Sequence, residues 1–191
     1  MKTIFETERL SARPMQLSDA PRVTELFQEK DLAQNLARAP WPYALADAEN
    51  WLTLAQTQWD TGTEFPFAIL KDGVLVGSCG LVQIDAEENI WEIGYWIGKP
   101  FWGRGYVTEA AEGLLAWAAR EMGITRLVSG HISDNPASGR VLLKLGFTVA
   151  GEHTMYVKGR DCEVTAVRYV YGGAPAEVAL AVPHFAPEAK S

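Results

Sequence analysis

The sequence predicts an α+β domain, with helices on both faces of a mixed, mostly antiparallel sheet of about seven strands. Two alternating stretches meet at Asp72-Gly73 in FPFAILKDGVLVGSCGLVQID, which is a strong hairpin signal. The segment from Thr108 to Met122 instead repeats its apolar residues at the helical period. This segment lies between the strand-like stretches NIWEIGYWIG and RLVSGHIS, and a helical crossover normally joins parallel neighbours. A mixed sheet is therefore expected.

The N-terminal part is expected to hold one strand and two helices before the first hairpin. Residues 9–13 alternate apolar and polar side chains, as a strand does. Ser18-Asp19 is a capping signal for a helix that carries Val23, Leu26 and Phe27 on one face. The loop ARAPWPYALA then leads to a second amphipathic helix over about residues 47–60.

The C-terminal part is expected to hold a short helix, a second hairpin and a tail. Asn135-Pro136 opens the helix and Gly146 ends it. FTVAGEHTMYVKG and CEVTAVRYVYG form the hairpin through the turn at residues 159–161. From residue 173 the composition changes to Ala, Pro, Val and Glu. We therefore predict one domain over residues 1–172 and an appended tail over residues 173–191, either disordered or docked on a partner subunit.

Composition narrows the class of protein. The 191 residues are 48% hydrophobic, which suits one well-filled core, and a net charge of −7 argues against a nucleic-acid partner. Cys79 and Cys162 are far apart and, with three histidines, give no ligand spacing, so we expect no metal. There is no signal-peptide pattern and no apolar run near the roughly 20 residues of a membrane span. We expect a cytoplasmic protein without membrane contact.

A glycine turn, WGRGY, connects the strand NIWEIGYWIG to the helix that follows. Such a turn aims several backbone N–H groups at one anion. A dinucleotide fingerprint would need a further glycine where Thr108 stands, and a P-loop would need Gly-Lys-Ser/Thr, which is absent. What remains is a turn whose N–H groups, from Gly103 to about Thr108, suit a pyrophosphate at a helix N-terminus, with a plain, closely packed strand-to-helix turn as the alternative.

The motifs around this turn resemble the GNAT (Gcn5-related N-acetyltransferase) superfamily, in particular its RimJ/RimL branch of ribosomal-protein N-terminal acetyltransferases. ERLSAR, PYALADA, EIGYW, WGRGYVTEA and NPASGRVLLKLGF stand in family order, from near the N-terminus to RYVY. The resemblance implies the GNAT fold, whose sheet is splayed into a V between the YWIG and SGHIS strands, and acetyl-CoA as co-substrate. Pro100 departs from the general superfamily pattern, which costs a side-chain contact and leaves the backbone cradle unchanged.

The resemblance also implies which residues bind acetyl-CoA. Pantetheine would lie in the gap as a pseudo-strand, bonded to backbone groups near Trp96 and Ile97, and a bulge at the strand end would offer the Tyr95 or Ile97 N–H to the thioester oxygen. Asn135, whose other role is to cap the helix, would hold the pantetheine amide. The expected cofactor-binding residues are Tyr95, Trp96, Ile97, Trp102, Gly103, Arg104, Gly105, Tyr106, Thr108, Asn135 and Ser138.

The expected catalytic residues are Glu92 and Ser138. Glu92 is the candidate general base, with an outward-facing strand carboxylate as the alternative, and His131 competes because an imidazole titrates near neutrality. Leu142 stands where many superfamily members have the tyrosine that protonates the thiolate, so the resemblance points to Ser138, which could otherwise only support its helix. Neither cysteine lies in a motif, so the amine is expected to attack the thioester directly.

The acceptor is expected to be a primary amine, with a protein or peptide α-amine favoured. An α-amine has a pKa of about 8 and is easier to deprotonate than lysine, at about 10.4. Small amines such as antibiotics, polyamines or amino acids are the alternative, and a non-catalytic acyl-CoA-binding module, supported only by Leu142, is another. The acceptor-selecting residues are expected in the loop 36–46 and the turn YVKGRDCE. We expect the chain to be a monomer or a homodimer.

Overall fold

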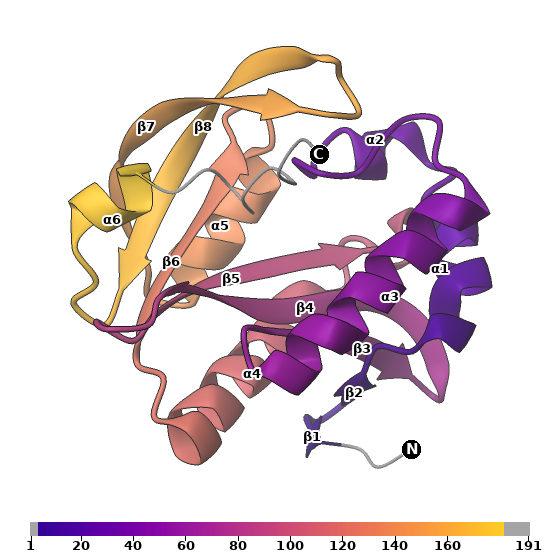
Figure 1. Ribbon diagram of the computed structural model, residues 1–191, viewed down its shortest axis with the longest axis horizontal. Helices are drawn as coiled ribbons and strands as arrows, with labels where there is room; N and C mark the ends of the chain where they lie inside the picture. The colour runs from indigo at the N-terminus through magenta and orange to yellow at the C-terminus, as the bar shows by residue number, and fades with distance from the viewer. Residues whose placement is uncertain (1–3, 182–191) are drawn as a thin grey trace.

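The computed structural model describes residues 4–181, which form one eight-stranded sheet with helices on both faces (Figure 1). The strand order is β1-β2-β3-β4-β5-β6-β8-β7, and every neighbouring pair is antiparallel except β5 and β6. The strands are β1 Phe5–Glu6, β2 Ser11–Pro14, β3 Glu64–Lys71, β4 Val74–Asp85, β5 Ile90–Ile97, β6 Arg126–Ile132, β7 Thr148–Val157 and β8 Cys162–Tyr171. The mixed α+β fold is confirmed, with the short β1 added to the expected strands.

The helices divide between the two faces of the sheet. They are α1 Ala20–Leu26, α2 Lys30–Ala33, α3 Leu45–Thr61, α4 Tyr106–Met122, α5 Pro136–Lys144 and α6 Ala176–Ala181, with 3-10 turns at Leu17–Asp19 and Lys99–Phe101. Buried residues of α1, α2 and α3 share one apolar cluster, whereas those of α4 and α5 share another. The sheet is thus covered on both sides, as the predicted fold class implied.

Glycine sets the element boundaries where the sequence analysis expected it to. The β3–β4 hairpin turns through Asp72 and Gly73, both at positive φ, and α4 ends at Gly123 with φ 65°. Helix α4 begins at Tyr106, two residues before the expected Thr108, because Gly105 is its N-cap at φ 77°. The turn motif therefore runs directly into the helix.

The sheet opens between β5 and β6. The two strands pair only through Ile90–Arg126, Trp91–Leu127 and Glu92–Val128, and then diverge (Figure 1). Beyond this point β5 stays paired with β4, and β6 stays paired with β8. Ser129 closes the apex with a hydrogen bond from its Oγ to the Ile93 carbonyl oxygen, at 2.8 Å. The predicted V is confirmed.

The Ala/Pro-rich segment begins with a helix that packs on its own chain. Helix α6 lies against β7 and β8, and Ala179 is completely buried. Residues 182–191 lie outside the described residues, so the domain boundary at 172 stays a prediction. Within residues 4–181, no helix is both long and apolar enough to span a membrane.

Candidate functional site

The glycine turn lies where β5 passes into α4. Gly103 and Gly105 adopt left-handed φ values of 73° and 77°, and Gly105 is the N-cap residue of α4, with no side chain to occupy the helix end. The N–H groups in the first turn of any helix have no partner within that helix. Arg104 is exposed, Thr108 is half-buried and Tyr106 is buried in the core. The turn therefore has the geometry of an anion site at a helix N-terminus.

The open edge of β5 leads from this turn to the apex of the V. The Ile93 carbonyl faces β6, since Ser129 binds it. Backbone groups of a strand alternate between its two edges, so those of Tyr95 and Ile97 also face the gap. The indole Nε1 of Trp102 donates to the Ile97 carbonyl oxygen at 2.6 Å, which agrees with this orientation. Backbone donors and acceptors thus line the gap at the positions expected for Tyr95 and Ile97.

Trp96 is placed differently from its expected role. By the same alternation, its backbone faces β4, where it pairs with Ser78. Its side chain is buried on the opposite face from Tyr95, with its ring 4.9 Å from that of Phe27. The β4–β5 pairing is regular through Gly94, so the splay arises from the departure of β6 and not from a bulge against β4. The Trp96 side chain therefore packs in the core, and its backbone groups do not face the gap between β5 and β6.

A cluster of polar side chains surrounds the first turns of α5, and we call Tyr95, His131, Ser138 and Tyr169 the α5 cluster. The Tyr95 hydroxyl lies 3.1 Å from Ser138 Oγ and donates to the Ser138 carbonyl oxygen at 3.2 Å. A Cβ on Gly139 would lie 2.8 Å from His131 Nε2 and 3.0 Å from the Tyr169 hydroxyl, so both side chains reach α5 at this glycine. Burial raises the pKa of Tyr95, which therefore stays protonated near neutral pH.

Two further α5 positions bear on the cofactor. Asn135 is the N-cap residue, but its side chain makes no capping hydrogen bond. The amide is consequently available for the role that the resemblance implies. Leu142 is completely buried in the core, and the hydroxyl groups of Ser138 and Tyr95 meet in the first turn of this helix.

Glu92 does not meet the requirements of a general base in this structure. Its side chain is completely buried, and its Oε1 accepts a hydrogen bond at 2.7 Å from Nη1 of the equally buried Arg168. It lies on the face of β5 opposite Tyr95, because side chains alternate along a strand. A base must come within hydrogen-bond reach of the acceptor's proton. The strand pattern placed Glu92 near the thioester but could not reveal its buried arginine partner.

A hollow of about 290 Å³ lies beside Trp102, lined by Asp31, Gln34, Asn35, Trp102, Asp134 and Arg160. Arg160 holds this rim together: its guanidinium binds both carboxylate oxygens of Asp134, at 2.6 and 2.9 Å, and the Gln34 carbonyl at 2.7 Å. The hydrogen bonds from Arg160 lower the pKa of Asp134. The sequence analysis singled out the turn containing Arg160 only as a candidate acceptor-selecting segment.

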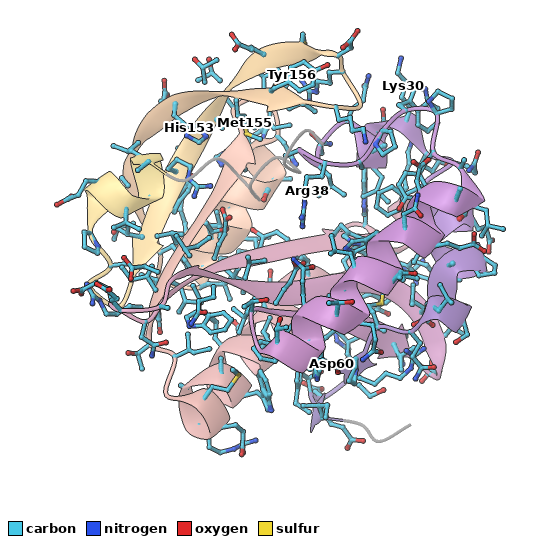
Figure 2. The ribbon with its side chains drawn as sticks, in the orientation of Figure 1. Lys30, Arg38, Asp60, His153, Met155 and Tyr156 are labelled. Carbon is cyan, nitrogen blue, oxygen red and sulfur yellow. The ribbon has the colours of Figure 1, made fainter. Side chains whose placement is uncertain are left out.

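The two candidate acceptor-selecting segments meet in the structure. Lys158 donates its backbone N–H to the Ala37 carbonyl at 2.9 Å, which joins the β7–β8 turn to the loop after α2. In Figure 2, Tyr156 of β7 and Lys30 of α2 lie at the same end of the molecule. This contact brings segments separated by more than a hundred residues to one side of the V.

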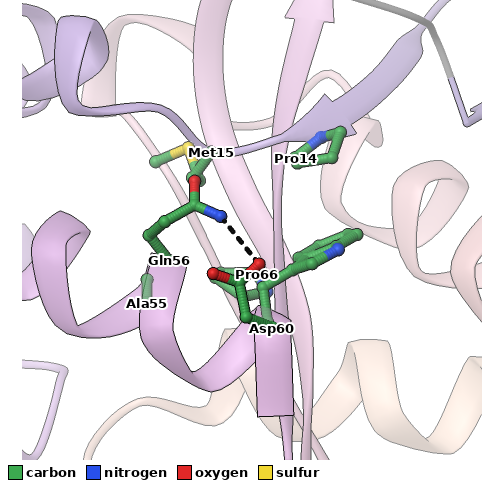
Figure 3. A pocket seen from close by; sticks show the side chains of 7 residues that line it. Pro14, Met15, Ala55, Gln56, Asp60 and Pro66 are labelled. Carbon is green, nitrogen blue, oxygen red and sulfur yellow. Dashed lines mark hydrogen bonds between the residues drawn. The ribbon is translucent and has the colours of Figure 1, made fainter. Parts of the chain in front are cut away.

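A second hollow, of about 240 Å³, is lined by none of the predicted site residues. Pro14, Met15, Ala55, Gln56, Trp59, Asp60 and Pro66 line it (Figure 3). Its polar rim is a hydrogen bond from the Gln56 amide to the Asp60 carboxylate, at 3.2 Å.

The remaining reactive groups are few. Cys79 is buried, and burial raises the pKa of its thiol, so no thiolate forms there near neutral pH. Cys162 is exposed on the β7–β8 hairpin. Across residues 4–181, no group of three or more His, Cys, Asp or Glu side chains could hold a metal ion.

Comparison with known proteins identifies the family. An acetyltransferase (GNAT) domain model matches residues 9–148. The chain is 26% identical over 162 residues to an uncharacterized N-acetyltransferase of Bacillus licheniformis, covering 84% of this chain and 90% of that protein. It is 28% identical over 168 residues to the putative ribosomal N-acetyltransferase YdaF of Bacillus subtilis, covering 83% and 90% respectively.

A solved structure of RimL, the ribosomal L7/L12 alpha-N-protein acetyltransferase, in complex with coenzyme A has the same fold. Its TM-score is 0.76 at 22% identity, and the match covers 90% of this chain and 99% of that one. The family model spans the turn, the open β5 edge and the α5 cluster up to Ser138. The chain belongs to the GNAT family of N-acetyltransferases.

Proposed function

We propose that this enzyme transfers an acetyl group from acetyl-CoA directly to a primary amine, and that its preferred acceptor is the α-amine of a protein or peptide. One observation carries the proposal. The anion-binding turn at Gly103–Gly105 continues into the open edge of β5, and that edge ends beside the Tyr95–Ser138 hydroxyl pair. Phosphate, amide and thioester groups of one extended cofactor find suitable partners along this path.

The turn would hold the pyrophosphate through the backbone N–H groups from Gly103 to Thr108, with Arg104 exposed beside it. The pantetheine arm would bond the backbone groups of Tyr95 and the N–H of Ile97, and the Asn135 amide would reach the arm from the other side of the gap. Trp102, whose indole now binds the Ile97 carbonyl, would flank the arm. The acetyl group would then lie near Tyr95 and Ser138.

Acetyl transfer forms a C–N bond and breaks the C–S bond, so an oxyanion, a thiolate and an amine proton must each be managed. A backbone N–H of Tyr95 or Ile97 would stabilise the oxyanion. Ser138, hydrogen-bonded to Tyr95, would relay a proton from a water molecule to the thiolate, whose conjugate thiol has a pKa of the order of cysteine's, about 8.5. His131 is favoured over Glu92 as the base that accepts the amine proton, because His131 belongs to the α5 cluster whereas Glu92 is bound by Arg168.

The acceptor class is supported by the names of similar proteins. RimL and YdaF are named for ribosomal acceptors, and RimL specifically for an α-amine. A small amine acceptor is the alternative. Direct attack is supported by the buried Cys79, since no activated thiol is available to form an acetyl-enzyme there.

The test measures thiol release from acetyl-CoA with four acceptors: a lysine-free peptide with a free α-amine, its N-blocked counterpart with one lysine, a polyamine and an aminoglycoside. Turnover confined to the first peptide is expected. Turnover with only the polyamine or the aminoglycoside would overturn the acceptor class while leaving the chemistry intact. Radiolabelled acetyl retained on the protein without an acceptor would refute direct transfer.

A further inference from the structure

Glu109 in the first turn of α4 is bound by the N-terminal segment, a hundred residues away in the sequence. Its Oε1 accepts hydrogen bonds from the Thr7 hydroxyl at 2.6 Å and from the Arg9 backbone N–H at 2.8 Å. Its Oε2 lies 2.6 Å from both Nε and Nη2 of the Arg9 guanidinium. Arg9 belongs to the family motif ERL and Glu109 to the motif TEA, yet neither residue has a place in the proposed chemistry. The network therefore needs an explanation of its own.

Arg9 reaches beyond Glu109 to the glycine turn itself. Its Nη1 donates to the carbonyl oxygen of Arg104 at 3.0 Å, and its guanidinium carbon lies 5.0 Å from the centre of the Tyr106 ring. A trans peptide directs its C=O and its N–H in opposite directions. Binding the Arg104 carbonyl on the outer side thus fixes the Gly105 N–H toward the other side of the turn, where an anion would lie.

The charge of Glu109 makes its partner necessary for anion binding. Although burial raises the pKa of Glu109, the hydrogen bonds from Thr7 and Arg9 outweigh this effect and lower the pKa overall. Glu109 is consequently a carboxylate near neutral pH. An isolated negative charge in the first turn of α4 would repel a second anion at the same helix end. Arg9 neutralises that charge.

We propose that Arg9 and Glu109 are positioning residues of the cofactor turn: Arg9 orients the Gly105 N–H and masks the Glu109 carboxylate, so that the turn accepts the cofactor's pyrophosphate. This inference rests on the proposed use of acetyl-CoA. It assigns to the N-terminal motif a role in cofactor affinity that is separate from the acetyl-transfer step.

The test compares CoA affinity, measured by isothermal titration calorimetry, in five proteins: the wild type, Arg9→Gln, Arg9→Lys, Arg9→Gln/Glu109→Gln and Arg120→Gln. Arg9→Gln should raise the Kd about tenfold, the effect of one charge at a helix N-terminus. Arg9→Lys should be intermediate, because an ammonium group cannot bind Glu109 and the Arg104 carbonyl with one fork. The double variant should bind more tightly than Arg9→Gln, because the exposed carboxylate is gone.

Arg120→Gln is the matched control, since it breaks an exposed ion pair with Glu121 in the last turn of the same helix. Its Kd should equal that of the wild type. In turnover assays Arg9→Gln should raise the KM for acetyl-CoA with kcat nearly unchanged, a split that mere destabilisation would not produce.

An unchanged Kd in a folded Arg9→Gln protein would overturn this inference alone. A double variant no better than Arg9→Gln would refute the masking of Glu109. A wild-type protein that binds no CoA would refute the proposed cofactor, and with it this inference.

Discussion

The buried pair of Glu92 and Arg168 offers the sharpest test of how the apex of the V is held. Arg168 crosses β6 above Gly130, where an added Cβ would lie 2.9 Å from its Nη1. Its Nη1 binds Glu92 at 2.7 Å, and its Nε binds the Ala179 carbonyl of α6 at 2.7 Å. One side chain therefore ties β8 to β5 and to α6. Arg168→Met removes these bonds while preserving much of the side chain's apolar length.

The loss can be estimated from the burial of the pair. Both side chains are 0% exposed, and removing one partner of a buried ion pair costs about 3–5 kcal/mol. The bond to Ala179 is part of the same network, so its loss does not add independently. We expect Arg168→Met to lower the free energy of unfolding by about 4 kcal/mol, which corresponds to a fall of roughly 10 °C in Tm for a chain of this size.

Urea unfolding followed by circular dichroism measures this change, with the slope m expected to stay constant. The double variant Glu92→Leu/Arg168→Met should recover at least half of the loss, because the buried carboxylate goes with the arginine. A loss below about 1 kcal/mol in Arg168→Met would refute the reasoning. A double variant as unstable as the single one would refute the electrostatic explanation. Glu92→Gln should likewise lose stability with little change in kcat; a large fall in kcat at unchanged stability would restore Glu92 as the base.

Three further predictions concern the site. In steady-state kinetics, Ser138→Ala should lower kcat about tenfold or more while the affinity for acetyl-CoA is kept, because proton transfer to the thiolate is impaired. Tyr95→Phe should show a smaller loss of kcat for the same reason. Kinetics equal to those of the wild type in both variants would exclude both residues from the transfer step. Gly105→Val should weaken CoA binding more than tenfold in calorimetry, because a β-branched residue at φ 77° is strained and distorts the turn; unchanged affinity would contradict the cradle assignment. The pKa of Asp134 is lowered in the folded state, so its contribution to stability is full above its ordinary pKa of about 3.9 and is lost as pH falls through the folded value. Thermal unfolding between pH 6 and pH 2.5 should therefore show a weaker acid dependence in Asp134→Asn, and identical profiles would contradict the contact with Arg160.

Local signals in the sequence were sufficient for most elements. Asp72-Gly73 predicted the β3–β4 hairpin, and the helical period with Gly123 predicted α4 and its end, because turn chemistry and periodicity are properties of neighbouring residues. The family motifs indicated the GNAT fold, and the helical crossover indicated the parallel pair of β5 and β6. The structure bears out both predictions with small shifts in boundaries, such as the start of α4 at Tyr106, whereas anion binding at the glycine turn stays a prediction.

What the sequence could not provide is the set of contacts between distant segments. Strand alternation placed Glu92 on β5 but gave no sign of Arg168, which is 76 residues away and buried in the same space. It also left open which strand edge Trp96 would present, since that depends on where β6 departs. A charged side chain can act as a base, line a surface hollow or form a buried ion pair between strands, and its contact partner decides which of these it does.

The sequence by itself therefore determined most of the secondary structure and the family, because each depends on short-range patterns. Only the tertiary structure decided that Arg9 meets Glu109, that Tyr95 meets Ser138 and that Glu92 is enclosed with Arg168. These pairings depend on how the sheet opens and which helices cover it. Packing of the whole chain fixes that geometry, so no local motif can specify it.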